Sequence, residues 1–143
     1  MSYASLDDLK KRVGERMLVQ LTDRAEPATG LIDAAVIADK LRDADAEIDS
    51  YLAGRYRLPI AGAVPSRLID LASAIAIYKL HTYEPDAKIV RDYDRAIADL
   101  GKIANGAIRL EIAGAEPQTS GASGVQAVDR ERPLSPESLT GFI

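Results

Sequence analysis

The sequence predicts an all-α protein, a compact bundle of about four to five helices followed by an extended C-terminal arm. Apolar residues recur every three or four positions through most of the first 106 residues, which is typical of amphipathic helices. Segments rich in Pro and Gly separate these periodic stretches. After residue 112 the composition shifts to Gly, Ser, Pro and charge, with too little apolar surface to fold alone. We therefore expect a helical domain over 1–106 and a strand, arm and tail over 107–143.

Two short helical segments are expected near the N-terminus. Ser5 and Asp8 have the spacing of a capping box, so the first helix begins after Ser5. Gly14 ends this helix, and a second short helical turn follows over 15–21. The segment over 22–30 contains Pro, Gly and Thr and is expected to be a loop.

The strongest helical pattern lies in the middle of the chain. Asp33 is the expected N-cap, and apolar residues then repeat at spacings of four, three, four and four: Ile37, Leu41, Ala44, Ile48 and Leu52. Pro59 pushes Leu58 into an extended conformation, so this helix ends before Leu58.

Two further helices are expected. Pro65 suits the first turn of a helix, and the segment that follows is apolar on several sides, which predicts a central position. The last helix begins near Asp86 and ends at Asn105-Gly106, since both residues tolerate the left-handed conformation. Apolar and charged residues then alternate over 107–112, a period of two that predicts one short β-strand paired within this chain or with another.

Composition excludes several classes of function. The net charge of −4 and the pI near 5.0 argue against electrostatic binding of nucleic acid. The chain has no cysteine, which excludes disulfides and cysteine-based metal or redox sites. No apolar run is long enough for a membrane span and the N-terminal residues do not resemble a signal peptide, so we expect a cytoplasmic protein.

No catalytic, cofactor or metal site is predicted. His81 is the only histidine, and no nucleophile motif accompanies it, so its expected place is a helix terminus. The acidic residues over 43–49 point in different directions on a helix and have no nearby His, which favours a solvated face over a metal site. An enzyme is therefore the least favoured class.

Two groups of residues suggest surfaces for partners. Arg55, Tyr56 and Arg57 are of types enriched at interface hot spots; the alternative is that the tyrosine packs in the core and the arginines pair with nearby Asp residues. The end of the chain carries four apolar residues on a polar arm: Leu134, Leu139, Phe142 and Ile143. Burial of Phe142 in a partner groove would contribute about 2 kcal/mol, whereas the alternative is a disordered terminus.

Three blocks of the sequence resemble the Mu-like bacteriophage small head-to-tail joining family. They are SYASLDDLKKRVGERMLVQLTD, IDAAVIADKLRDADAEIDSYLAGRYRLP and YDRAIADLGKIANG. With the VPSRLIDLASAIAIYKL segment between the second and third, they cover most of residues 1–106. EIDSYLAGRYRLP is the most specific part. Val13 departs from the phenylalanine expected in the family, and the tail from about Gly114 is not covered.

This resemblance implies an all-helical virion protein of the neck, assembled in the host cytoplasm. Such proteins form a homo-oligomeric ring beneath the portal protein, extend the DNA channel and provide the docking surface for a stopper or tail-terminator protein. It places Arg55, Tyr56 and Arg57 at a subunit or portal contact. An acidic channel wall would let DNA slide without specific binding, and four residues are candidates for that wall: Asp39, Asp43, Asp45 and Asp49.

Two alternatives remain open at this point. The first is an assembly or tail-completion factor that does not stay in the virion, and detection in purified particles separates it from a connector. The second is a small helical interaction module such as a DNA-binding regulator. The acidity of the chain argues against the second, and a salt-dependent affinity for DNA would support it.

Overall fold

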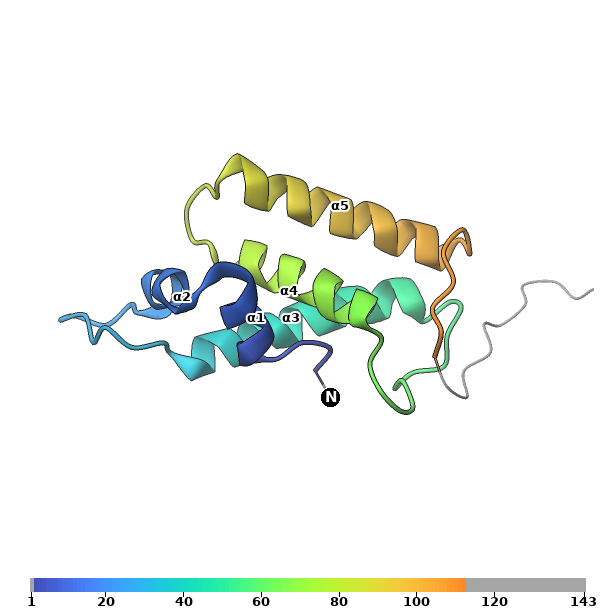
Figure 1. Ribbon diagram of the computed structural model, residues 1–143, viewed down its shortest axis with the longest axis horizontal. Helices are drawn as coiled ribbons and strands as arrows, with labels where there is room; N and C mark the ends of the chain where they lie inside the picture. The colour runs from blue at the N-terminus through green and yellow to red at the C-terminus, as the bar shows by residue number, and fades with distance from the viewer. Residues whose placement is uncertain (1, 113–143) are drawn as a thin grey trace, which may run out of the picture.

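The computed structural model describes residues 2–112, and this part of the chain is an all-α bundle of five helices (Figure 1). The helices are α1 (Leu6–Val13), α2 (Glu15–Thr22), α3 (Ala34–Leu52), α4 (Ser66–Leu80) and α5 (Ala87–Ala104). The predicted fold class is therefore confirmed. None of these helices is long and apolar enough to cross a membrane.

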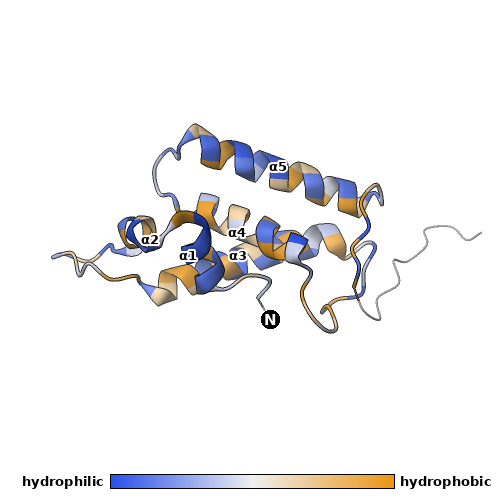
Figure 2. Cartoon of the chain, viewed as in Figure 1, coloured by the Kyte–Doolittle hydropathy of each residue, from blue (hydrophilic) through white to orange (hydrophobic). Residues whose placement is uncertain are grey.

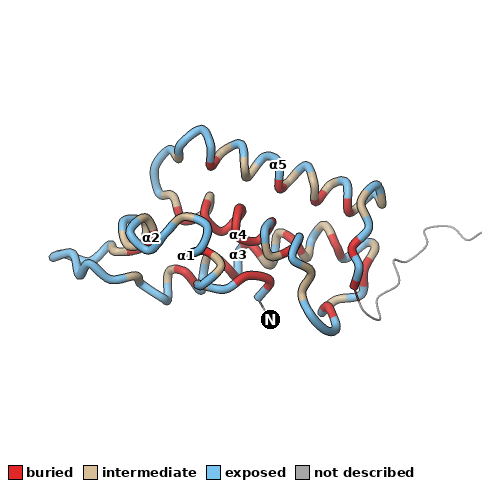
Figure 3. Tube along the Cα trace, in the orientation of Figure 1, coloured by how far each residue is buried: buried red, intermediate tan, exposed pale blue. Residues whose placement is uncertain are grey.

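Helix α4 lies at the centre of the bundle and packs against α1, α3 and α5. Every residue from Leu71 to Ile77 is buried, so α4 has no solvent-facing stripe over two of its turns (Figure 3). By contrast, α3 and α5 alternate apolar and polar residues and bury one face each (Figure 2). The broad apolar surface of α4 in the sequence therefore correctly predicts its central position.

Local capping defines the helix ends as expected. The Ser5 hydroxyl accepts a hydrogen bond from the Asp8 N–H, and the Asp8 carboxylate accepts one from the Ser5 N–H at 2.9 Å. The Asp33 carboxylate accepts from the first backbone N–H groups of α3. Gly106, two residues after the end of α5, has a φ of +84°, in the left-handed region that is common after a helix C-terminus.

Residues 15–22 form a complete helix, longer than the short turn expected from sequence. Its C-terminus is tied to the start of α3 by Thr22, whose buried hydroxyl donates to the Leu18 carbonyl at 2.8 Å and accepts from the Asp33 N–H at 3.0 Å. This tertiary link stabilises the last turn of α2, which the sequence pattern does not reveal.

The prediction of a strand over 107–112 is wrong, because the described residues contain no strand. The segment is extended but lies against the helices: Leu110 and Ile112 are buried in the core. No second strand accompanies it in residues 2–112, and its N–H groups bond elsewhere, as Ile108 N–H does to the Lys102 carbonyl at 3.1 Å. The alternating pattern thus reflects one buried side of an extended segment.

The connecting segments gather at two opposite ends of the bundle. Residues 23–33 and 81–86 lie at one end, where Asp23 and Arg24 share a groove of about 360 Å³ with His81 and Tyr83. Residues 53–65 and 105–112 lie at the other end, past the C-termini of α3 and α5. The 19 residues of α3 separate the two ends by about 28 Å.

Candidate interaction surfaces

Tyr56 anchors the C-terminal segment to the bundle. Beyond Leu52 the chain turns once more, with the N–H groups of Arg55 and Tyr56 donating to the Leu52 carbonyl at 2.9 and 2.8 Å. This turn buries the Tyr56 ring, which is only 2% exposed, and its hydroxyl accepts a hydrogen bond from the Leu110 N–H at 3.0 Å. Tyr56 is therefore a core residue, and the expectation that it contacts another subunit is corrected by its burial.

Arg55 and Arg57 differ in exposure. Arg55 is half-buried, and a Cβ on Gly106 would overlap its guanidinium, so the arginine head lies directly against the glycine backbone. Within residues 2–112 the buried Nε of Arg55 has no hydrogen-bond partner and the side chain makes no ion pair. Arg57 is exposed. Of the three predicted contact residues, Arg57 is thus the only one that is exposed.

The four acidic candidates on α3 divide into two pairs with different roles. Asp45 and Asp49 are half-buried and hold the N-terminal segment: the Tyr3 N–H donates to Asp45 Oδ1 at 3.0 Å, and the Tyr3 hydroxyl donates to Asp49 Oδ1. Burial raises the pKa of the Asp45 carboxyl. Burial and the bond to Asp49 raise the pKa of the Tyr3 hydroxyl well above its usual value.

Asp39 and Asp43 form the second pair and lie exposed on α3. Each is matched by a cation three residues away in the helix, Arg42 Nη2 at 2.9 Å from Asp39 and Lys40 Nζ at 3.2 Å from Asp43. The open part of this face therefore alternates in charge. The predicted acidic wall is reduced to two carboxylates with neighbouring counterions.

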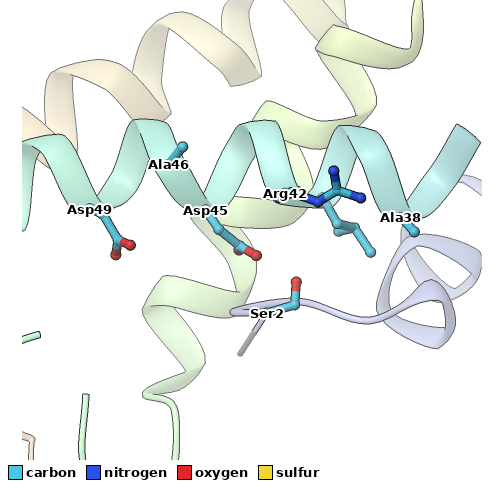
Figure 4. Close-up of a pocket in the computed structure, with 7 residues that line it drawn as sticks. Ser2, Ala38, Arg42, Asp45, Ala46 and Asp49 are labelled. Atoms are coloured by element: carbon cyan, nitrogen blue, oxygen red, sulfur yellow. The ribbon is translucent and has the colours of Figure 1, made fainter. Parts of the chain in front are cut away.

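A groove of about 460 Å³ runs along α3, and Asp45 and Asp49 are among the residues that line it (Figure 4). Asp45 points toward Ser2 across the groove, and Asp49 lies one turn further along the same helix. Ala38, Ala46 and Arg42 also line the groove. Asp45 and Asp49 both accept hydrogen bonds from Tyr3. The groove therefore borders the contact between α3 and the N-terminal segment of the same chain.

A polar cluster joining α3, α4 and α5 is absent from the sequence-based expectations. The Tyr93 hydroxyl donates to Glu47 Oε1 at 3.1 Å, and the Tyr93 ring stacks on Tyr78 with centroids 4.0 Å apart. Lys79 Nζ lies 2.9 Å from Glu47 Oε2 and forms an ion pair with it. Burial and Glu47 raise the pKa of Tyr93 to about 12. No local signal marks this cluster, since Glu47 and Tyr93 are 46 residues apart.

Three further expectations concern the histidine, a metal site and the C-terminal apolar residues. His81 follows α4, and its Nδ1–H donates to the Ile77 carbonyl at 2.7 Å, as expected of a helix-terminal histidine. Residues 2–112 contain no group of three His, Asp or Glu side chains placed to hold a metal ion. The predicted docking residues Leu134, Leu139, Phe142 and Ile143 lie outside the described residues.

Comparison with known proteins places the chain among phage proteins. The family described as Bacteriophage Mu, Gp36 matches residues 3–128. The Mu-like prophage FluMu protein gp36 of Haemophilus influenzae is 31% identical over 141 residues, which cover 99% of this chain and 98% of that protein. Gene product J of Escherichia phage Mu is 30% identical over 143 residues, and the match covers both chains completely. This chain belongs to the Bacteriophage Mu Gp36 family.

Proposed function

We propose that this protein is a structural virion protein of the phage neck that forms a ring beneath the portal, extends the DNA channel and joins head to tail. Membership of the Gp36 family supports a role in a Mu-like phage, and the resemblance to head-to-tail joining proteins supports the position in the neck. The protein acts as an assembly component without catalysis, and its partners are further copies of itself, the portal and a stopper or tail-terminator protein.

The observation that carries this proposal is the attachment of the C-terminal segment at the end of the bundle. Tyr56 and the buried side chains of Leu110 and Ile112 hold this segment against the helices. The chain beyond residue 112 therefore starts from a defined point on the body. A ring protein that reaches a neighbour with an arm needs such a defined origin, since a shifted origin would displace every contact that the arm makes.

The arm and the exposed arginine are the contacts that we assign to partners. Phe142 and Ile143, with Leu134 and Leu139 upstream, supply the apolar anchors for a groove on the portal or on a neighbouring subunit. Arg57 supplies a directional contact on the body itself. Asp39 and Asp43 are the two acidic residues of α3 that remain open for a channel wall.

Electron microscopy of lysates from a phage that lacks this gene tests the proposal. DNA-filled or leaky heads beside unattached tails are the expected result, and the wild-type gene supplied in trans should restore whole particles. Normal infectious particles without the gene would reject the connector. Defective particles combined with absence of the protein from purified wild-type virions would instead assign it as a non-virion assembly factor.

A further inference from the structure

The two ends of the bundle carry opposite charge. Residues 23–33 and 81–86, here called the acidic end, contain five carboxylates and one arginine: Asp23, Arg24, Glu26, Asp33, Glu84 and Asp86. Residues 53–65 and 105–112, the basic end, contain three arginines and one carboxylate: Arg55, Arg57, Arg109 and Glu111. The length of α3 keeps them about 28 Å apart. This distance is about three screening lengths at physiological salt, so each end presents its own charge to a partner.

The charged residues of the two ends form no ion pair within residues 2–112, whereas several charged residues on the sides do. On the side formed by α5, Asp92 pairs with Arg12 and Lys88, and Asp99 pairs with Arg67 and Lys102. In residues 2–112, no ion pair involves Glu26, Glu84 or Asp86 at the acidic end, nor any arginine of the basic end. The charges of the two ends thus have no ion-pair partner in residues 2–112; some side chains on the sides, such as Asp7 and Asp94, have none either.

The two ends also differ in the size of the apolar side chains that they expose. The large apolar side chains that stand out from the described surface are Leu31, 69% exposed, and Tyr83, 89% exposed, and both belong to the acidic end. The basic end presents small apolar residues, since Pro59, Ala61 and Ala63 are all exposed. The acidic end therefore offers a protruding tyrosine and leucine surrounded by carboxylates. The basic end offers a surface of small residues beside its arginines, which such protruding side chains can pack against.

We propose that the acidic end of one copy docks on the basic end of the next. This contact specifies the ring of the proposed function and rests on it. It is heterologous, with different surfaces from the two copies, and such a contact generates a ring when the rotation between successive copies closes. Nucleic acid fits these surfaces less well, because it would leave Leu31, Tyr83 and the acidic end uncovered and would meet a chain with a net charge of −4.

Charge reversal at each end provides the test, using the full chain and sedimentation velocity over a concentration series at low and high salt. One variant is Glu26→Lys with Glu84→Lys; the other is Arg57→Glu with Arg109→Glu. All four side chains are exposed, so the fold should be retained, and circular dichroism checks this. Arg55 is left unchanged because it packs against Gly106. The matched control is Asp7→Lys with Asp94→Lys, two exposed acidic residues on the sides of the bundle.

The wild type should self-associate, less strongly at high salt. Each end variant should associate at least tenfold more weakly, while an equimolar mixture of the two restores association. The two lysines leave the acidic end with three carboxylates and three cations and so remove its attraction to the basic end, and the two glutamates make the basic end acidic, so that like charges meet. The mixture is decisive, since the unchanged acidic end of the arginine variant can meet the unchanged basic end of the lysine variant, and at the other junction the introduced lysines face the introduced glutamates. The side control should behave as the wild type.

A wild-type chain that stays monomeric throughout, or a mixture that stays as weak as its components, would overturn the contact. Binding of duplex DNA that the arginine variant loses, with unchanged self-association, would overturn it in favour of a nucleic-acid surface. Failure of this contact is separable from failure of the proposed function. The deletion phage reports on the connector role alone, and the mixture of variants reports on the contact alone.

Discussion

The backbone N–H of Leu110 donates a hydrogen bond to the hydroxyl of Tyr56 at 3.0 Å, although the two residues lie 54 positions apart in the chain. Both residues are buried. The bond joins the turn after α3 to the extended segment after α5, so one side chain determines how the C-terminal segment lies on the body. It also explains why a tyrosine stands between two arginines at this end of the molecule.

Replacing Tyr56 by Phe should lower the free energy of unfolding by about 1–3 kcal/mol, because the buried Leu110 N–H then has no acceptor. Urea unfolding followed by circular dichroism measures this change. Amide exchange should also be faster at Leu110 than in the wild type. Tyr83→Phe is the matched control: this exposed side chain should change stability by less than about 0.5 kcal/mol. Equal effects of the two substitutions would show that the Tyr56 hydroxyl has no anchoring role.

Replacing Gly106 by Ala should destabilise the protein by about 1–2 kcal/mol, since φ of +84° is unfavourable for a residue with a Cβ. The new methyl would also displace the Arg55 guanidinium. Thermal unfolding provides the measurement. The control is Gly101→Ala, inside α5, where the added carbon would have no atom within 4 Å apart from its own stretch of the helix; this change should stabilise the helix by about 0.5–1 kcal/mol. Stabilisation by both alanines would contradict the backbone argument.

Replacing Asp45 by Asn should make the protein more stable at neutral pH and leave it unchanged near pH 3. Burial raises the pKa of Asp45, so the folded chain loses stability as pH rises through that raised value and the carboxyl ionises. Asparagine cannot ionise, and its side-chain oxygen still accepts the bond from the Tyr3 N–H.

Urea unfolding of both proteins between about pH 3 and pH 7 tests this expectation. The difference in unfolding free energy should grow with pH in favour of the asparagine variant. Asp39→Asn, on the exposed side of the same helix, is the control and should show no such growth. A constant difference across the pH range would mean that ionisation of Asp45 does not affect folding.

Tyr93 should make the protein lose stability in alkali. Burial and Glu47 raise the pKa of Tyr93 to about 12 in the folded chain, against about 10 when unfolded. Between these values the unfolded chain loses its proton first, so the free energy of unfolding falls as pH rises. Tyr93→Phe should reduce the slope of that fall, although it lowers stability at pH 7 by removing the bond to Glu47. Unfolding measured from pH 9 upward gives the slope, and an unchanged slope in the variant would exclude Tyr93 as its source.

Local patterns predicted the helices because helix formation depends on neighbouring residues. Ile37, Leu41 and Ile48 recur at helical spacing, and all three are buried as expected. Ser5 and Asp33 cap their helices through bonds to residues within one turn. The segment over 107–112 misled the same reasoning, because period-two alternation reports one buried side and does not show whether a partner strand exists.

The interaction residues were predicted less completely. Type and position suggested that Tyr56 faces a partner, but burial depends on what the rest of the chain places around it, here Leu110. The same limitation applies to Asp45 and Asp49, which appear as part of a solvated acidic face until Tyr3 is seen to bind them from 42 and 46 residues away. Arg57 is exposed, and its assignment to a subunit contact stays a prediction.

The sequence by itself determined the helical class, the approximate bounds and capping of the helices, and the family, because these depend on short-range periodicity and on matching residues. Only the tertiary structure decided which polar side chains are internal anchors and which are open. It also brought separate loops together into an acidic end and a basic end. The physical reason is that charge and burial at a surface are sums over segments distant in the chain, and only packing determines which segments contribute.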